Sequence, residues 1–297
     1  GDVCPAEEMD AEDTLFILYT SGSTGKPKGI VHSVAGYMVY SDYTFRNIFR
    51  CGSEDVYWCT ADIGWITGHT YIVYAPLLSG ITSVMYEGIP TYPDTSRWWN
   101  IIEKYKVNIF YTSPTAIRTL ETFGTSPIEP CNLQSLKILG TVGEPINESA
   151  WHWYHKNIGK EKCPIVDTWW QTETGGIMIS PFPAIKEQKP GFAMFPLPGI
   201  VPVIMNEKGE ELKGNDVEGN LCFSKPWPGM LRTIYKDHER CKKTYFNRFP
   251  EFYFSEDNCR RDKDGHYRIT GRTDDVIKVS GHLLGTAEIE NAINQHE

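Results

Sequence analysis

The chain has 297 residues, of which 40% are hydrophobic, so it can bury a large core and is not expected to be disordered. Its formal net charge of -9 disfavours non-specific binding to phosphate backbones, which argues against a nucleic-acid partner. The eight cysteines are scattered without a CxxC pair, which indicates reduced thiols and no zinc site.

No apolar segment of about 18 residues and no signal peptide are visible, so we expect no membrane partner and, by default, a cytoplasmic location. The sequence begins with Gly1 rather than Met and stops at "IENAINQHE", which reads as the middle of a helix. We therefore expect a central piece of a longer protein, and a targeting segment could belong to the part outside it. The sequence does not indicate an oligomeric state.

Short apolar runs alternate with longer amphipathic runs between residues 14 and 170. This alternation implies an α/β fold with a mostly parallel sheet and helices on both faces, and such sheets bind ligands at the carboxyl ends of their strands. The predicted strands are residues 15–19, 56–59, 81–85, 109–111, 136–141 and 165–169, and the predicted helices are residues 32–49, 68–78, 96–105, 114–123 and 148–158.

Beyond Gly175 the sequence becomes rich in Pro and Gly, and its segments are short, with turn signals such as "KGND" and "DKDG". This texture predicts a smaller antiparallel β subdomain that runs to about Arg272. We therefore expect three parts: an α/β ligand-binding region over residues 1–199, a small β-rich subdomain over residues 200–272, and a last part over residues 273–297.

The stretch "TSGSTGKPKG" at residues 20–29 follows an apolar run directly. Its glycines let the backbone approach a ligand closely, and Lys26 and Lys28 offer positive charge. A strand, such a loop and then a helix start is a phosphate-binding arrangement. The loop does not match GxxxxGK[ST], because Pro27 stands where a magnesium-binding hydroxyl would be. Taken alone, it could equally be a solvated surface turn.

Polar side chains follow two later predicted strands, in "VGEPIN" (residues 142–147) and "VDTWWQTETGG" (residues 166–176). Asp167, Thr172 and Glu173 carry groups able to bind ribose hydroxyls, phosphate and Mg²⁺ at a strand's carboxyl end. The alternative for the adjacent Trp pair is a place in the core, which is the usual outcome for such residues. Single charged residues in the later turns, such as Asp257 and Arg272, are most often only solvated.

Four motifs, taken together, are specific enough to indicate a protein family. In "YTSGSTGKPKGIVH", "CTADIGWITGHTY", "VGEPINESAWHWYHKNIGKEKCPIVDTWWQTETGG" and "GRTDDVIKVSGH", and in their order, the chain resembles the adenylate-forming acyl- and aryl-CoA synthetases, and among them the acetyl-CoA synthetases. The resemblance covers nearly all 297 residues. It implies the large N-terminal domain core of the adenylate-forming fold, with residues 273–297 as the hinge and the start of a C-terminal lid domain.

The resemblance also implies a reaction in two steps. Acetate attacks the α-phosphate of ATP to give acetyl-AMP and pyrophosphate, and the thiol of CoA then displaces AMP. The implied small molecules are ATP, Mg²⁺, acetate and CoA. The protein's own contribution would be positioning and charge neutralisation.

By the same resemblance, Thr172 and Glu173 are the catalytic residues of this part of the protein, and Glu173 is the Mg²⁺ ligand. Ser113 and Ser280 would lie near CoA, and Asp274 would be the hinge. The implied acetate pocket is Ile66, Thr67, Val142 and Trp170. The implied ATP- and AMP-binding residues are Thr20, Ser21, Gly22, Ser23, Thr24, Gly25, Lys26, Gly143, Glu144, Pro145, Asp167, Thr168, Trp169, Trp170, Gln171, Thr172, Asp257 and Arg272.

Trp170 decides the expected chain length of the substrate. An indole at this position fills volume that a longer acyl chain would need, so we expect acetate rather than propionate. The sequence departs from the family pattern at Leu283, where many members carry Arg. It also lacks the Gly-Lys motif that holds the family's catalytic lysine, so we expect this piece by itself to be nearly inactive in adenylation.

Three alternatives stay open. A propionyl-CoA or other short-chain acyl-CoA synthetase differs from an acetyl-CoA synthetase by only one or a few carbons of substrate. A non-catalytic nucleotide-binding module would bind the nucleotide without turnover. An unrelated nucleotide-binding α/β protein would require all four motifs to be accidental.

Overall fold

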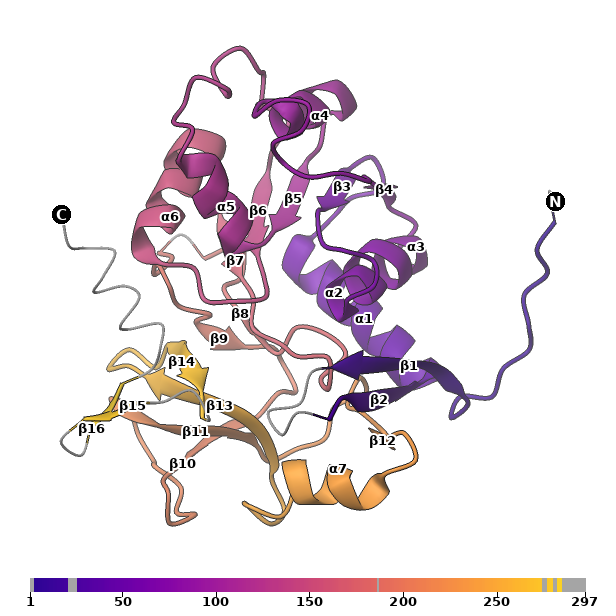
Figure 1. Ribbon diagram of the computed structural model, residues 1–297, viewed down its shortest axis with the longest axis vertical. Coiled ribbons are helices and arrows are strands. Elements are labelled where there is room, and N and C mark those ends of the chain that lie inside the picture. The colour runs from indigo at the N-terminus through magenta and orange to yellow at the C-terminus, as the bar shows by residue number, and fades with distance from the viewer. Residues whose placement is uncertain (1–2, 21–25, 186, 274–276, 280–281, 285–297) are drawn as a thin grey trace.

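The structure is a computed structural model that describes residues 3–20, 26–185, 187–273, 277–279 and 282–284 (Figure 1). None of the helices in these segments is both long and apolar enough to cross a membrane.

A five-stranded parallel sheet forms the centre of the α/β region, as predicted. Its strands lie in the order β4-β3-β5-β6-β7, and each pairs in parallel with its neighbours. The strands are β3 (Val56–Cys59), β4 (Thr82–Val84), β5 (Ile109–Thr112), β6 (Ile138–Thr141) and β7 (Ile165–Asp167).

Alternate side chains of these strands face two separate hydrophobic clusters. Tyr57 and Tyr111 point to one face of the sheet, whereas the adjacent residues Trp58 and Phe110 point to the other. Both faces are therefore apolar, which is why the strands read as continuous apolar runs.

Helical segments cover both faces of the sheet (Figure 1). On the side of Tyr111 lie α1 (Val34–Phe49), α2 (Ile66–Gly68), the π-helical η1 (His69–Tyr74) and α3 (Ala75–Leu78). On the side of Phe110 lie α4 (Arg97–Tyr105), α5 (Pro114–Glu121), α6 (Glu148–Trp153) and the π-helical η2 (Tyr154–Ile158). The predicted helices at residues 68–78 and 148–158 thus each contain a π-helical stretch.

The segment around the glycine-rich stretch differs from the prediction. We expected a strand, a loop and then a helix from residue 32, but a second strand, β2 (Lys28–Ser33), pairs antiparallel with β1 (Thr14–Thr20) before α1 begins. All six residues of β2 are buried, and Ser33 keeps an extended backbone. The β-branched pair Ile30 and Val31 favours a strand at this buried place.

The second part of the chain is antiparallel, as predicted. A four-stranded sheet has the order β10-β11-β13-β14, and β12 (Thr233–Ile234) joins β2 instead. The division at residues 199 and 272 stays a prediction. The remaining elements are β8 (Ile179–Ser180), β9 (Phe195–Pro196), β10 (Pro202–Met205), β11 (Val217–Phe223), α7 (His238–Tyr245), β13 (Tyr253–Arg261), β14 (Tyr267–Arg272), β15 (Ile277–Val279) and β16 (His282–Leu284).

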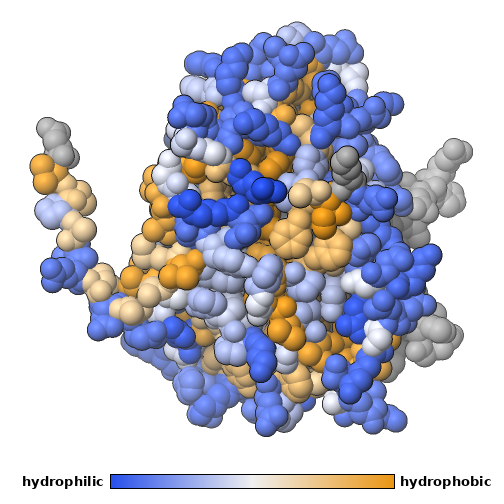
Figure 2. Space-filling view, turned by 180° about the vertical axis from the view of Figure 1, so that it is seen from behind, coloured by the Kyte–Doolittle hydropathy of each residue, from blue (hydrophilic) through white to orange (hydrophobic). Residues whose placement is uncertain are grey.

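The surface carries both apolar and hydrophilic side chains. Figure 2 shows that, on the face behind that of Figure 1, apolar side chains gather in the middle while hydrophilic ones dominate the top and the rim. Such apolar area is ordinary for a protein surface and does not by itself mark a site.

Candidate active site

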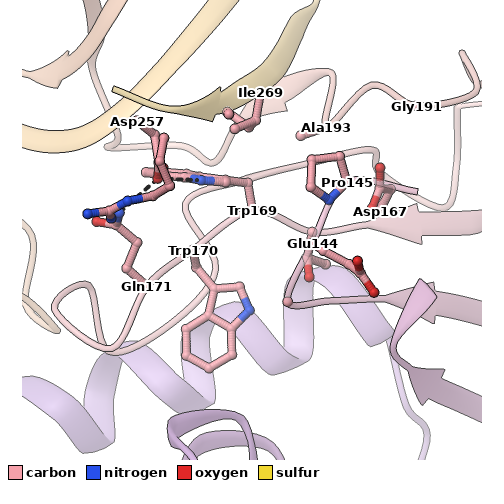
Figure 3. A pocket seen from close by; sticks show the side chains of 14 residues that line it. Glu144, Pro145, Asp167, Trp169, Trp170, Gln171, Gly191, Ala193, Asp257 and Ile269 are labelled. Carbon is pink, nitrogen blue, oxygen red and sulfur yellow. Dashed lines mark hydrogen bonds between the residues drawn. The ribbon is translucent and has the colours of Figure 1, made fainter. Parts of the chain in front are cut away.

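A cleft of about 400 Å³ lies at the carboxyl ends of β6 and β7, where it meets the antiparallel sheet (Figure 3). Ligands of open α/β sheets bind at this edge. The cleft is lined by Gly143, Glu144, Pro145, Asp167, Thr168, Trp169, Trp170, Gln171, Gly191, Ala193, Asp257, Ile269, Gly271 and Arg272. Ten of these fourteen are residues that the sequence predicted for a nucleotide.

Four lining residues were missed: Gly191, Ala193, Ile269 and Gly271. They carry no polar side chain, so no chemical signal in the sequence distinguishes them from loop or core residues. The fold brings them to the cleft from the segment before β9 and from β14.

The turn after β6 is anchored at Gly143 and Glu144. Gly143 has a φ of 99°, in the region that favours glycine. The carboxylate of Glu144 accepts a hydrogen bond at 2.8 Å from the backbone N–H of Thr115 and another at 2.9 Å from Arg118. Burial alone would raise the pKa of Glu144, but hydrogen bonds from Thr115 and Arg118 hold it below its usual value. The turn is therefore fixed to the start of α5.

Asp257 lies directly opposite Arg272 in the β13–β14 register, which explains how residues 15 positions apart share one cleft wall. Its Oδ2 accepts hydrogen bonds from Gln171 Nε2 at 2.8 Å and from Trp169 Nε1 at 3.2 Å (Figure 3). Burial raises the pKa of Asp257 to about 7, against the opposing effect of Arg272. The carboxyl group is held in a fixed orientation at the cleft.

Asp167 is a second buried carboxyl group at this cleft. Thr141 Oγ1 donates a hydrogen bond to its Oδ1 at 2.7 Å. Burial raises the pKa of Asp167 to about 7, because this single hydrogen bond only partly offsets the loss of water. Two acids with pKa values near neutrality therefore face the same cleft, which is typical of functional sites.

A second cleft of about 530 Å³ adjoins the first, and the two share Gly143, Trp170 and Gln171. All four residues predicted for the acetate pocket meet here, together with Ser113 and Thr172. Ser113 is also the N-cap of α5, where its Oγ accepts a hydrogen bond from Ala116 N at 3.2 Å. The lining residues are Thr60, Ala61, Asp62, Trp65, Ile66, Thr67, Thr112, Ser113, Val142, Gly143, Trp170, Gln171 and Thr172.

The tryptophan pair divides its contacts between core and cleft. Trp169 stacks on Phe223, with ring centroids 5.7 Å apart, and Trp170 meets Tyr71 edge to face at 5.0 Å. Both indoles are only partly buried and both line the first cleft. They therefore hold the cleft wall to the core.

The turn from Gln171 to Ile177 is held by hydrogen bonds to its backbone carbonyls. His32 Nε2 lies 2.7 Å from the carbonyl oxygen of Thr172, Leu231 N donates to that of Glu173 at 2.8 Å, and Trp227 Nε1 donates to that of Thr174 at 2.8 Å. Burial lowers the pKa of His32 to about 4, so the ring is neutral at pH 7 and its Nε2–H serves as donor. Thr172 and Glu173 are therefore held in place by elements distant in sequence.

Glu173 belongs to a cluster with the buried residues Lys28 and Tyr245 and with Glu256, which is partly buried. Lys28 Nζ lies 3.1 Å from Glu256 Oε2 and 3.5 Å from Glu173 Oε1, and 4.9 Å from the centre of the Tyr245 ring. The hydroxyl of Tyr245 donates to Glu173 Oε1. Of the two lysines expected to offer charge to a phosphate, Lys28 thus points inward, because two carboxylates neutralise it there.

The model of the AMP-binding enzymes matches residues 2–235. This chain belongs to the AMP-binding enzyme family. Two curated acetyl-coenzyme A synthetases, from Syntrophobacter fumaroxidans and Rubrobacter xylanophilus, are each 59% identical to this chain over 293 residues. An acetyl-coenzyme A synthetase from Bradyrhizobium diazoefficiens is 57% identical over 294 residues. These alignments cover 99% of this chain but 45% of each relative, so the chain spans a little less than half their length.

The glycine-rich stretch at residues 20–29 is described only in part, because residues 21–25 lie outside the described residues. Thr20 closes β1, and Lys26 is exposed, with its carbonyl oxygen accepting a hydrogen bond from Arg240 at 2.5 Å. The other predicted site residues, Ser21, Gly22, Ser23, Thr24, Gly25, Asp274 and Ser280, lie outside the described residues.

Proposed function

We propose that the protein activates acetate with ATP and transfers the acetyl group to CoA. In the first step a carboxylate oxygen of acetate attacks the α-phosphorus of ATP, and pyrophosphate leaves. In the second step the sulfur of CoA attacks the acyl carbon, the thiol proton is lost, and AMP leaves. Because the chain spans less than half the length of its relatives, the proposal concerns the whole protein that contains it.

The observation that carries this proposal is the adjacency of the two clefts at Trp170. The cleft proposed for the nucleotide, with its candidate ribose-binding groups, meets the second cleft, which is lined by Ile66, Thr67 and Val142. A carboxylate in the second cleft would reach an α-phosphate held at their shared wall, which is the geometry that acyl adenylation requires. The names of the relatives, acetyl-coenzyme A synthetase, support the same substrate class.

The roles of individual residues follow from their chemistry. Asp257 and Arg272 would bind the ribose hydroxyls, and Gly143 to Pro145 and Asp167 to Gln171 would line the adenine and ribose. Thr172 would contact the phosphate of the nucleotide that lies near the acetate. The ends of the stretch at residues 20–26 would hold the β- and γ-phosphates. Ser113 and Ser280 near CoA, Asp274 as the hinge and a cytoplasmic location stay predictions.

Magnesium fits the groups present at Glu173. Its carboxylate and the hydroxyl of Thr172 are oxygen donors, which Mg²⁺ prefers, and both described contacts of the carboxylate are made by Oε1. When bound, Mg²⁺ would neutralise phosphate charge. The fixed turn at residues 171–177 would keep Glu173 and Thr172 at the nucleotide.

The test is ATP–pyrophosphate exchange by the full-length protein with acetate, propionate and butyrate in parallel. We expect acetate to give the highest kcat/KM, and Trp170→Gly to shift the preference to the longer acids, because the indole no longer fills their volume. Preference of the wild type for propionate would indicate a propionyl-CoA synthetase. Nucleotide binding without exchange for any acid would indicate a non-catalytic module and overturn the proposal.

A further inference from the structure

Tyr111 lies directly behind Trp170 without lining either cleft. It is fully buried on β5, and its hydroxyl oxygen is 3.3 Å from Trp170 Nε1, which donates to it, and 2.6 Å from Thr168 Oγ1. Tyr111 therefore connects the indole at the acyl cleft to Thr168, which is fixed in turn to the carbonyl oxygen of Thr141 at 2.9 Å.

The ring of Tyr111 has little freedom to move. Gly140 faces it from β6, and a Cβ added at Gly140 would lie 2.6 Å from Tyr111 Cδ2, so the ring fills the space that the glycine leaves. Phe49 and Tyr71 contact it edge to face, at 4.8 and 5.8 Å between ring centroids. The hydroxyl oxygen that accepts from Trp170 is therefore held at a defined point.

Two different contacts act on the indole of Trp170. The ring of Tyr71 limits how far the indole can move back, since its own hydroxyl is held by Thr44 Oγ1 and by Ile177 N, each at 2.8 Å. The hydrogen bond to Tyr111 limits rotation of the indole, because it fixes the direction of the N–H. Without that bond the side chain could adopt other orientations within the cleft.

We infer that Tyr111 is a positioning residue that determines acyl-chain length through Trp170. Its hydroxyl holds the indole across the acyl cleft, so a one-carbon extension of the substrate meets a rigid wall. An indole released from this bond can yield to a propionate methyl group, whereas acetate does not need that space. This inference rests on the proposed acetate activation, and it adds a determinant that does not touch the substrate.

The experiment compares Tyr111→Phe with wild type in the full-length protein, by pyrophosphate exchange with acetate and with propionate. A hydrogen bond of typical strength corresponds to about a fivefold change in an equilibrium or rate constant, so we expect the acetate-over-propionate ratio of kcat/KM to fall by about fivefold. The KM for ATP should change little, because Thr168 keeps its hydrogen bond to the carbonyl oxygen of Thr141. A merely structural role would lower activity with both acids alike and leave the ratio constant.

Tyr154→Phe is the matched control. Tyr154 is also fully buried, and its hydroxyl donates a bond of 3.3 Å to the carbonyl of Phe110, the neighbour of Tyr111 on β5, but on the opposite face of the sheet. Tyr154→Phe loses one hydrogen bond of the same length as the bond between Trp170 and Tyr111, without touching Trp170, so the ratio should stay at the wild-type value.

The coupling to Trp170 gives a second test. In a Trp170→Gly background, Tyr111→Phe should change the ratio no further, because the side chain through which it acts is absent. Should Tyr111→Phe fail to fold, Gly140→Ala displaces the same ring from β6 and should shift the ratio in the same direction.

The outcomes separate the two proposals. A wild type without acetate-dependent exchange would overturn the proposed function and this inference with it. A wild type that prefers acetate, combined with a folded Tyr111→Phe that keeps the wild-type ratio, would overturn this inference alone. An equal ratio shift in Tyr154→Phe would also overturn it, since the effect would then not act through Trp170.

Discussion

The burial and orientation of the Asp257 carboxyl group could not be predicted from its residue type alone. An aspartate in a turn-like setting is usually only solvated, but this one is buried and oriented by two side-chain donors, Trp169 and Gln171. Such an oriented acceptor suits the two hydroxyls of a ribose. The sequence names the residue only through the family resemblance, whereas the strand register explains its place opposite Arg272.

We predict that Asp257→Asn weakens AMP binding by about tenfold to a hundredfold, the loss expected for hydrogen bonds to a charged group. Isothermal titration at pH 8, above the pKa of about 7 of this carboxyl group, measures the effect on the ionised form. Asp264→Asn, an exposed aspartate in the turn that connects β13 and β14, is the matched control and should bind AMP normally. Equal affinities of Asp257→Asn and wild type would remove Asp257 from the ribose site.

Asp167 leads to a prediction about stability and pH. Its pKa is 3.8 in the unfolded chain and about 7 in the fold, so between these values the folded state keeps a proton that the unfolded chain has lost. Its contribution to stability is therefore present at low pH and is lost as pH rises towards 7. Asparagine has no such proton and can still accept the hydrogen bond from Thr141.

Asp167→Asn should consequently gain stability relative to wild type as pH rises from 5 to 8, by about 2 kcal/mol. Urea unfolding of both proteins at several pH values measures this difference. Other titrating groups occur in both proteins and cancel in the comparison. A difference that does not vary with pH would show that the carboxyl group of Asp167 titrates as it does in the unfolded chain.

At the scale of elements, apolar runs were a good guide where the two faces of a strand are both buried. The runs at β3, β5 and β6 appear in the sequence as continuous apolar segments, and their parallel pairing follows from the helices between them. The strand β2 was missed because only His32 and Ser33 separate its apolar pair from the start of α1, and no Gly or Pro marks where the strand ends and the helix begins.

Helix α7 contacts the glycine-rich stretch at residues 20–29 through Arg240. The guanidinium group donates to the carbonyl oxygens of Lys26 and Pro27, at 2.5 and 3.2 Å, while the backbone N–H of Arg240 is capped by Asp237 at 3.2 Å. The sequence gives no hint of this contact, because the residues are more than 200 positions apart and α7 was not predicted.

We predict that Arg240→Ala raises the KM for ATP by about tenfold, the effect of losing charge-assisted hydrogen bonds that hold the stretch. The KM for acetate should change little, since the acyl cleft lies on other elements. Steady-state kinetics of the full-length protein with each substrate varied in turn gives both values. Lys243→Ala, an exposed lysine on the same helix, serves as control, and an ATP KM that stays at the wild-type value in Arg240→Ala would contradict the anchoring role.

At the scale of the whole molecule, one partly buried charged cluster joins segments from both parts of the chain. Lys28 comes from β2, Glu173 from the turn after β7, and Glu256 from β13, with Arg272 of β14 3.6 Å from Glu256. Glu256 has a φ of 62°, unusual for a residue other than glycine. The parallel sheet with its clefts was predictable from local patterns, but this cluster was not, since its members are scattered and each resembles an ordinary surface charge.

From this cluster we predict that the stability of the protein depends on the charge of Lys28. Lys28→Met removes the only cation within 4.0 Å of Glu173 among the described residues, whereas Glu256 keeps Arg272 at 3.6 Å. Removing one partner of a buried ion pair typically costs about 3–5 kcal/mol, because the other charge loses its compensation, and here that charge is Glu173. Urea unfolding should therefore show Lys28→Met to be less stable than wild type by about this amount.

A second substitution separates charge from packing. In the Lys28→Met background, Glu256→Gln removes one of the two remaining carboxylates, so the double variant should be more stable than Lys28→Met alone, although Glu256→Gln by itself destabilises the wild type. This reversal of sign is the mark of an electrostatic coupling between the residues. If the two losses of stability simply add, Lys28 contributes by packing against Tyr245, and the charged cluster does not hold β2 to β13.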